Sequence, residues 1–109
     1  MTKADQIEHN FIALGIFDIA MEELYNTHGN YAQYSLRKCS ATVLETKNYF
    51  ILRSYDTYVS AIEKNFNICV DVLRNKCGYT PTSKQHIARF KHDFSDKNRV
   101  LTLYTWRHV

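Results

Sequence analysis

The spacing of hydrophobic and polar residues changes along the chain, and each change marks a predicted element. Near the N-terminus Ile7, Phe11 and Leu14 recur at intervals of four and three residues, as one face of a helix requires. Gly15 then interrupts the pattern before helical spacing resumes, and a glycine there either caps one helix or kinks a longer one. We therefore predict a broken helix, or two helices, within residues 1–27.

The middle of the chain has a different pattern. From Ala41 to Leu73 it is rich in β-branched and aromatic residues and contains no Gly or Pro, which is typical of strands. Polar clusters divide this stretch, and the two Asn of the last cluster favour a tight turn. The clusters are residues 46–48, 54–56 and 64–67. The segments between these clusters, together with an edge strand from Tyr34 to Cys39, predict an antiparallel meander over residues 31–73.

The inward face of this sheet is predicted from the alternation of side chains along each strand. The alternation is imperfect, and a shift of one residue would exchange the two faces. The residues expected to point inward are Val43, Phe50, Leu52, Val59, Ala61, Ile68, Val70 and Val72.

The C-terminal third predicts one more helix and one more strand. After the Pro81 turn, the run from Thr82 to Gln85 matches a capping box, so a helix is predicted over residues 82–94. A final strand is predicted over residues 100–107. Residues 1–109 therefore form a single α+β domain in this prediction. It has an antiparallel meander sheet of four to six strands, with both helices packed on one face.

Charge is unevenly distributed, although the net charge of the 109 residues is only +3. The first thirty residues are acidic and the rest is basic, which predicts two electrostatic faces or, in the simpler alternative, uneven solvated charge. Asp18, Glu22 and Glu23 mark the acidic face. No apolar run is long enough to span a membrane, and the polar N-terminus does not resemble a signal peptide, so we expect a cytoplasmic protein.

Candidate catalytic and metal-binding groups are sparse. Cys39, Cys69 and Cys77 form no C-x-x-C pair and are predicted to be structural thiols. His86 and His92 lie six residues apart on one helix, point to different sides, and are predicted at the surface. With only three Gly spread along the chain, no phosphate loop is present. We therefore predict no enzyme activity, no catalytic residues, no metal and no cofactor.

Basic residues interleaved with aromatic ones are the clearest binding signal. Arg and Lys contact phosphates, whereas Tyr rings stack on bases or anchor a protein interface. In the alternative reading, most of these Tyr are half-buried on the sheet with solvated hydroxyls. The candidate binding residues are Tyr34, Arg37, Lys38, Arg53, Tyr55, Tyr58, Arg74, Lys76, Tyr79, Lys84, Arg89 and Arg107.

Five segments carry a resemblance to a known family. They are residues 35–39, 47–50, 53–57, 78–87 and 104–107. In these segments the chain resembles a small uncharacterised domain found in phages, plasmids and other mobile elements of Gram-positive bacteria, over roughly residues 30 to 109. No known activity and no catalytic residue of that family can be carried over to this chain.

Proteins of this size and setting also resemble the type II-A anti-CRISPR proteins, which inhibit Cas9. That resemblance implies a binding protein whose partner is Cas9 or its guide RNA, and which blocks their assembly or access to the target. An acidic face could occupy a positively charged nucleic-acid channel, while a basic face could hold RNA. The alternative is a nucleic-acid-binding accessory protein of the phage or plasmid itself.

Overall fold

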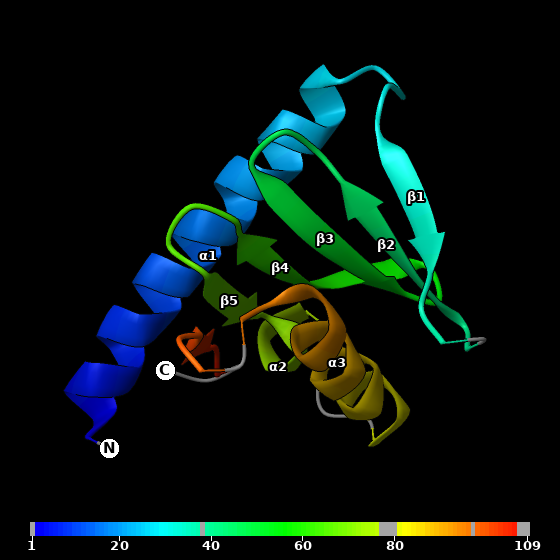
Figure 1. Ribbon diagram of the computed structural model, residues 1–109. Helices are drawn as coiled ribbons and strands as arrows, with labels where there is room; N and C mark the ends of the chain where they lie inside the picture. The colour runs from blue at the N-terminus through cyan, green and yellow to red at the C-terminus, as the bar shows by residue number, and fades with distance from the viewer. Residues whose placement is uncertain (1, 38, 77–80, 97, 107–109) are drawn as a thin grey trace.

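A computed structural model describes residues 2–37, 39–76, 81–96 and 98–106, in which helices cover both faces of a six-stranded sheet (Figure 1). The elements are α1 (Lys3–Asn26), β1 (Ala32–Ser35), β2 (Ala41–Glu45), β3 (Tyr49–Ser54), β4 (Thr57–Glu63), β5 (Ile68–Asp71), α2 (Leu73–Lys76), α3 (Pro81–Phe94) and β6 (Leu101–Tyr104). The predicted α+β class is confirmed. The short helix α2 was not predicted, and α3 begins one residue before the expected start.

Helix α1 is continuous, so the predicted break at Gly15 is wrong. A capping box between Thr2 and Asp5 starts the helix, as their spacing suggests. Gly15 faces solvent and has no positive φ, so the helix passes through it. Gly29, with φ of 88°, lies in the turn that follows the helix. None of the helices in the described ranges is both long and apolar enough to cross a membrane.

The six strands lie in the sheet in the order in which they occur in the chain. β1 to β5 pair antiparallel with their neighbours, which confirms the predicted meander. β6 instead pairs parallel with β5, because α2 and α3 carry the chain back across the sheet. The predicted turns are present, and Tyr55 and Asn67 adopt positive φ in two of them.

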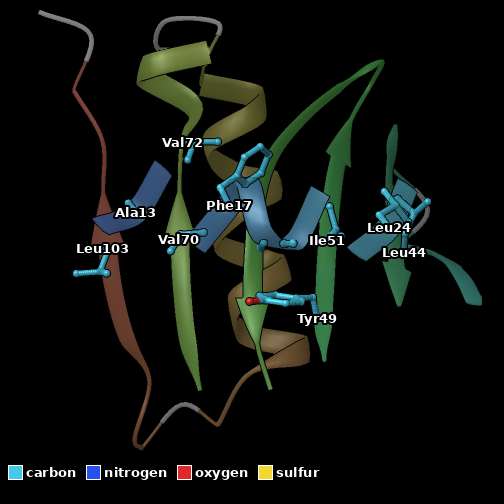
Figure 2. Packing of buried hydrophobic residues seen from close by; sticks show 11 residues of the cluster. Ala13, Phe17, Leu24, Leu44, Tyr49, Ile51, Val70, Val72 and Leu103 are labelled. Carbon is cyan, nitrogen blue, oxygen red and sulfur yellow. The ribbon is translucent and has the colours of Figure 1, made fainter. Parts of the chain in front are cut away.

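The two long helices lie on opposite faces of the sheet, so the prediction that both pack on one face is wrong (Figure 1). On the α1 side, Phe17 and Leu24 pack with Leu44, Ile51 and Val70, and Figure 2 shows this cluster between helix and strands. On the other side α3 contributes another cluster, whose fully buried members include Phe90, Val43, Leu52, Val59 and Ile62. Strands covered on both faces lose the simple hydrophobic–polar alternation that would have revealed one buried face.

A β-bulge further disturbs the alternation. The register between β3 and β4 shifts after Leu52, so Val59 and Ser60 both lie opposite this one residue. The predicted inward residues are consequently divided between the two faces. Val43, Phe50, Leu52 and Val59 belong to the α3 side, whereas Ala61, Ile68, Val70 and Val72 belong to the α1 side.

Candidate functional site

The predicted basic and aromatic residues do not form one patch. Near β1, the Arg37 guanidinium donates from Nε to Asp93 Oδ2 at 2.7 Å and also pairs with Asp93 Oδ1. These hydrogen bonds, with a further one from His92, hold the pKa of Asp93 well below its usual value. Tyr34 donates its hydroxyl to Glu45 at 2.7 Å. Arg37 and Tyr34 therefore connect parts of the fold, with Arg37 joining the β1–β2 turn to α3.

Other members of the set lie on different surfaces. Arg53 and Tyr58 face each other across β3 and β4, and Tyr58 packs against the α1-side cluster. The Arg53 Nε atom is buried and has no hydrogen-bond partner among the described residues. Arg74 and Lys84 lie beside a groove between α3 and β6, which is described below. Some of the predicted residues lie outside the part of the chain that the structure describes. They are Lys38, the side chain of Lys76, Cys77, Tyr79 and Arg107.

His86 is buried, with 3% of its surface exposed, so its predicted surface position is wrong. Its Nδ1 atom lies 2.8 Å from Ser54 Oγ, which in turn lies 2.9 Å from Ser83 Oγ. The Tyr55 ring covers the imidazole at a centroid distance of 5.8 Å. Burial, together with the nearby charge of Arg89, lowers the pKa of His86.

This cluster joins α3 to the turn between β3 and β4. Ser54 and His86 have the spacing of a nucleophile and its base, but each exposes only 3% of its surface. A substrate therefore has no access to the pair in this conformation. The hydrogen bonds instead fix the position of α3, and they bring together two of the segments that carry the family resemblance, around Ser54 and His86.

The predicted acidic face loses one of its three members. Asp18 and Glu22 are exposed on α1, but Glu23 turns toward the β2–β3 turn. Its carboxylate accepts hydrogen bonds from the Asn48 backbone N–H at 3.1 Å, the Asn48 amide at 2.6 Å and the Thr46 hydroxyl. Burial raises the pKa of Glu23, but these hydrogen bonds outweigh that effect and the pKa is lowered.

The solvent-facing side of α1 carries several exposed large hydrophobic side chains, which sequence reasoning missed. Its large hydrophobic side chains are at least two-fifths exposed, and Phe11 reaches 81%. They are Ile7, Phe11, Ile12, Ile19 and Tyr25. The Ile7–Phe11 stripe, interpreted as the start of one helical face, is thus not the face that packs on the sheet. We call these five residues, with Asp18 and Glu22, the outer face of α1.

A second surface feature is a groove between α3 and the β5–β6 edge of the sheet. One hollow of about 160 Å³ is lined by Asp71, Lys84, Ile87, Ala88, Lys91, Thr102 and Tyr104. A neighbouring hollow of about 340 Å³ is lined by Ala88, Lys91, His92, Ser95 and Val100. The two share Ala88 and Lys91, so together they follow the side of α3, and we call them the α3–β6 groove.

The two cysteines in the described part of the chain are both at least partly buried. Cys69 is fully buried, and burial raises the pKa of its thiol to about 11, which leaves it protonated at neutral pH. Cys39 is partly buried and donates to the Leu36 carbonyl. Among the described residues no group of three His, Cys, Asp or Glu side chains could hold a metal ion.

Comparisons with protein-family models, with curated proteins and with solved structures gave no match. The resemblances in the sequence therefore stay predictions. The functional argument rests on the two surfaces above, the outer face of α1 and the α3–β6 groove.

Proposed function

We propose that the protein acts by binding a partner protein on the outer face of α1, and that this partner is Cas9, whose activity it inhibits. The observation that carries the proposal is the exposure of five large hydrophobic side chains on one helix. Exposed apolar patches of this kind are costly in water and commonly mark sites of protein interaction. Aromatic anchors such as Phe11 and Tyr25 supply much of the binding energy in such interfaces.

Charge supports the choice of partner. Beyond Lys3, α1 contains no Lys or Arg, and the exposed carboxylates of Asp18 and Glu22 lie among its apolar side chains. A partner surface that complements the outer face of α1 is therefore apolar and positively charged. The nucleic-acid channel of a Cas9-type nuclease is positively charged, so occupation of this channel by α1 would exclude nucleic acid. A second copy of the chain is less suitable, because pairing two outer faces brings carboxylates of the same sign together.

The apolar part of this proposal is tested by the double substitution Phe11→Ser and Ile19→Ser. Both side chains point to solvent, so the fold should be retained and the docking surface lost. We expect inhibition of Cas9 cleavage to weaken about thirtyfold or more, as when interface anchors are removed. Phe66→Ser is the matched control, because Phe66 is 77% exposed and belongs to the β4–β5 turn, not to α1.

The charged part is tested by reversing Asp18 and Glu22 to Lys. Both carboxylates are exposed and form no hydrogen bond or ion pair with the described residues, whereas the same change at Glu23 would break its hydrogen bonds to the β2–β3 turn. We expect slower association with Cas9 and a weaker dependence of binding on salt. Full inhibition by both double variants would overturn the proposal, and so would a wild-type dimer that dissociates when Phe11 and Ile19 are replaced.

A further inference from the structure

We propose that the α3–β6 groove binds the phosphate backbone of a single-stranded nucleic acid. The groove lies on the opposite side of the sheet from α1, so this site is separate from the proposed docking surface for a protein. Its residues include Lys91, Thr102 and Tyr104, which the sequence did not single out. The inference stands or falls independently of Cas9 binding.

Positive charge is concentrated in this groove. Lys84 and Lys91 line its wall on α3, and Arg74 of α2 lies near enough to act electrostatically on the same carboxylate, Asp71. His92 lines the neighbouring hollow farther along α3. Three cationic side chains around one carboxylate leave an excess of positive charge, which favours an anionic ligand.

The shape of the groove favours a chain with several anionic groups. Lys84 and Lys91 are seven residues apart on one helix, which places them about 10 Å apart along the axis at 1.5 Å per residue. A single phosphate ion would occupy only part of that length. Successive phosphates of an extended strand can follow the side of α3 from one lysine to the other.

The floor of the groove offers contacts for bases and sugars. Tyr104 is 45% exposed and lies opposite Asp71 in the register of β5 and β6. A half-exposed ring of this kind provides a surface on which a base can stack. Next to it the Thr102 hydroxyl accepts a hydrogen bond from Lys91 Nζ at 3.2 Å, which holds the ammonium over the floor. A ring beside a row of cations is more typical of nucleic-acid binding than of acidic-peptide binding.

Asp71 limits the affinity of this site. Its carboxylate accepts a hydrogen bond from the Leu73 backbone N–H at 3.0 Å, and burial raises its pKa. While ionised, it attracts the surrounding cations and also repels a phosphate. Replacement by Asn keeps an oxygen for the Leu73 N–H and removes the negative charge.

The test measures binding of a labelled single-stranded oligouridine over a series of salt concentrations. For Lys84→Gln with Lys91→Gln we expect at least tenfold weaker binding, and a salt slope lower by about 1.4, at 0.7 for each lost phosphate contact. Lys3→Gln with Lys47→Gln removes the same charge from exposed positions outside the groove and should weaken binding less than threefold. Asp71→Asn should bind about threefold tighter or more.

Three results would overturn the inference. One is an equal loss of affinity in the two double variants, which would mean diffuse attraction by net charge. Another is weaker binding by Asp71→Asn when circular dichroism shows an intact fold. The third is equal competition by polyglutamate and by oligouridine, which would assign the groove to an acidic peptide. Because Cas9 binding is measured separately, failure here leaves the proposed function unaffected.

Discussion

Glu23 connects α1 to the sheet through a single carboxylate. It accepts hydrogen bonds from Thr46 and from two groups of Asn48 in the β2–β3 turn. We expect Glu23→Ala to lower the free energy of unfolding by about 2 kcal/mol, since hydrogen bonds to a charged group are lost and turn donors lose their acceptor. Urea unfolding measures this change. The neighbouring Glu22→Ala, on the exposed side, should change stability by less than about 0.5 kcal/mol, and equal effects would contradict this role.

His86 makes stability depend on pH. Burial lowers its pKa below the ordinary value of 6.5, so the unfolded chain binds a proton more readily than the folded protein does. The stabilisation is therefore complete above about pH 6.5 and is lost as the pH falls below that value. Arg89 is the charged group that acts on the imidazole, and it adds to the cost of protonation.

We expect the wild type to lose more stability between pH 7.5 and 5.5 than His86→Asn does, by up to about 1.4 kcal/mol, because pH 5.5 lies about one unit below the ordinary pKa of the imidazole. Chemical unfolding at the two pH values measures this. The control is His28→Asn, because His28 is exposed and Asn tolerates its positive φ of 53°. Identical pH dependence in wild type and His86→Asn would contradict the assignment.

At the scale of elements, α1 shows why a glycine need not break a helix. Gly15 lies mid-helix, and an added Cβ would meet no atom within 4 Å. We expect Gly15→Ala to raise the free energy of unfolding by about 0.5 to 1 kcal/mol, because alanine restricts the unfolded chain and fits the helical backbone. Thermal unfolding measures the effect. Destabilisation by this substitution would indicate a break at Gly15.

The strands and turns were predictable because their signals are local. β-branched runs form the strands, and Asn67 takes the positive φ expected in the β4–β5 turn. The sequence did not predict which face of the sheet each strand residue points to. Both faces are covered by helices, and the bulge at Val59 and Ser60 shifts the alternation of side chains. The helix α2 is a single short turn, too short to leave a periodic pattern.

The candidate surfaces were only partly predictable for a similar reason. Lys84 was expected to bind, but its position in the same groove as Tyr104 depends on the parallel pairing of β5 and β6, which no local pattern shows. The apolar outer face of α1 did leave a signal, since hydrophobic residues occur on every side of that helix. His86 looked exposed because its buried partner, Ser54, is distant in sequence.

At the scale of the whole molecule, the sheet separates two surfaces of opposite character. The helices α1 and α3 lie on opposite sides of the sheet (Figure 1). The outer face of α1 is apolar and acidic, and the α3–β6 groove is cationic. The groove gathers only part of the basic charge of the chain, because Arg37 pairs with Asp93 and Arg53 lies opposite Tyr58 in the sheet. On this account the protein could hold a protein partner on one side and a nucleic acid on the other at the same time.

The central claim is that a protein partner docks on the outer face of α1. Its most direct test is the dissociation constant of Cas9 for three chains, the wild type, Phe66→Ser, and Phe11→Ser with Ile19→Ser. We predict similar affinities for the wild type and Phe66→Ser, and binding about thirtyfold weaker or more for the double variant. Equal affinities for all three chains, or no binding of Cas9 by the wild type, would contradict the account.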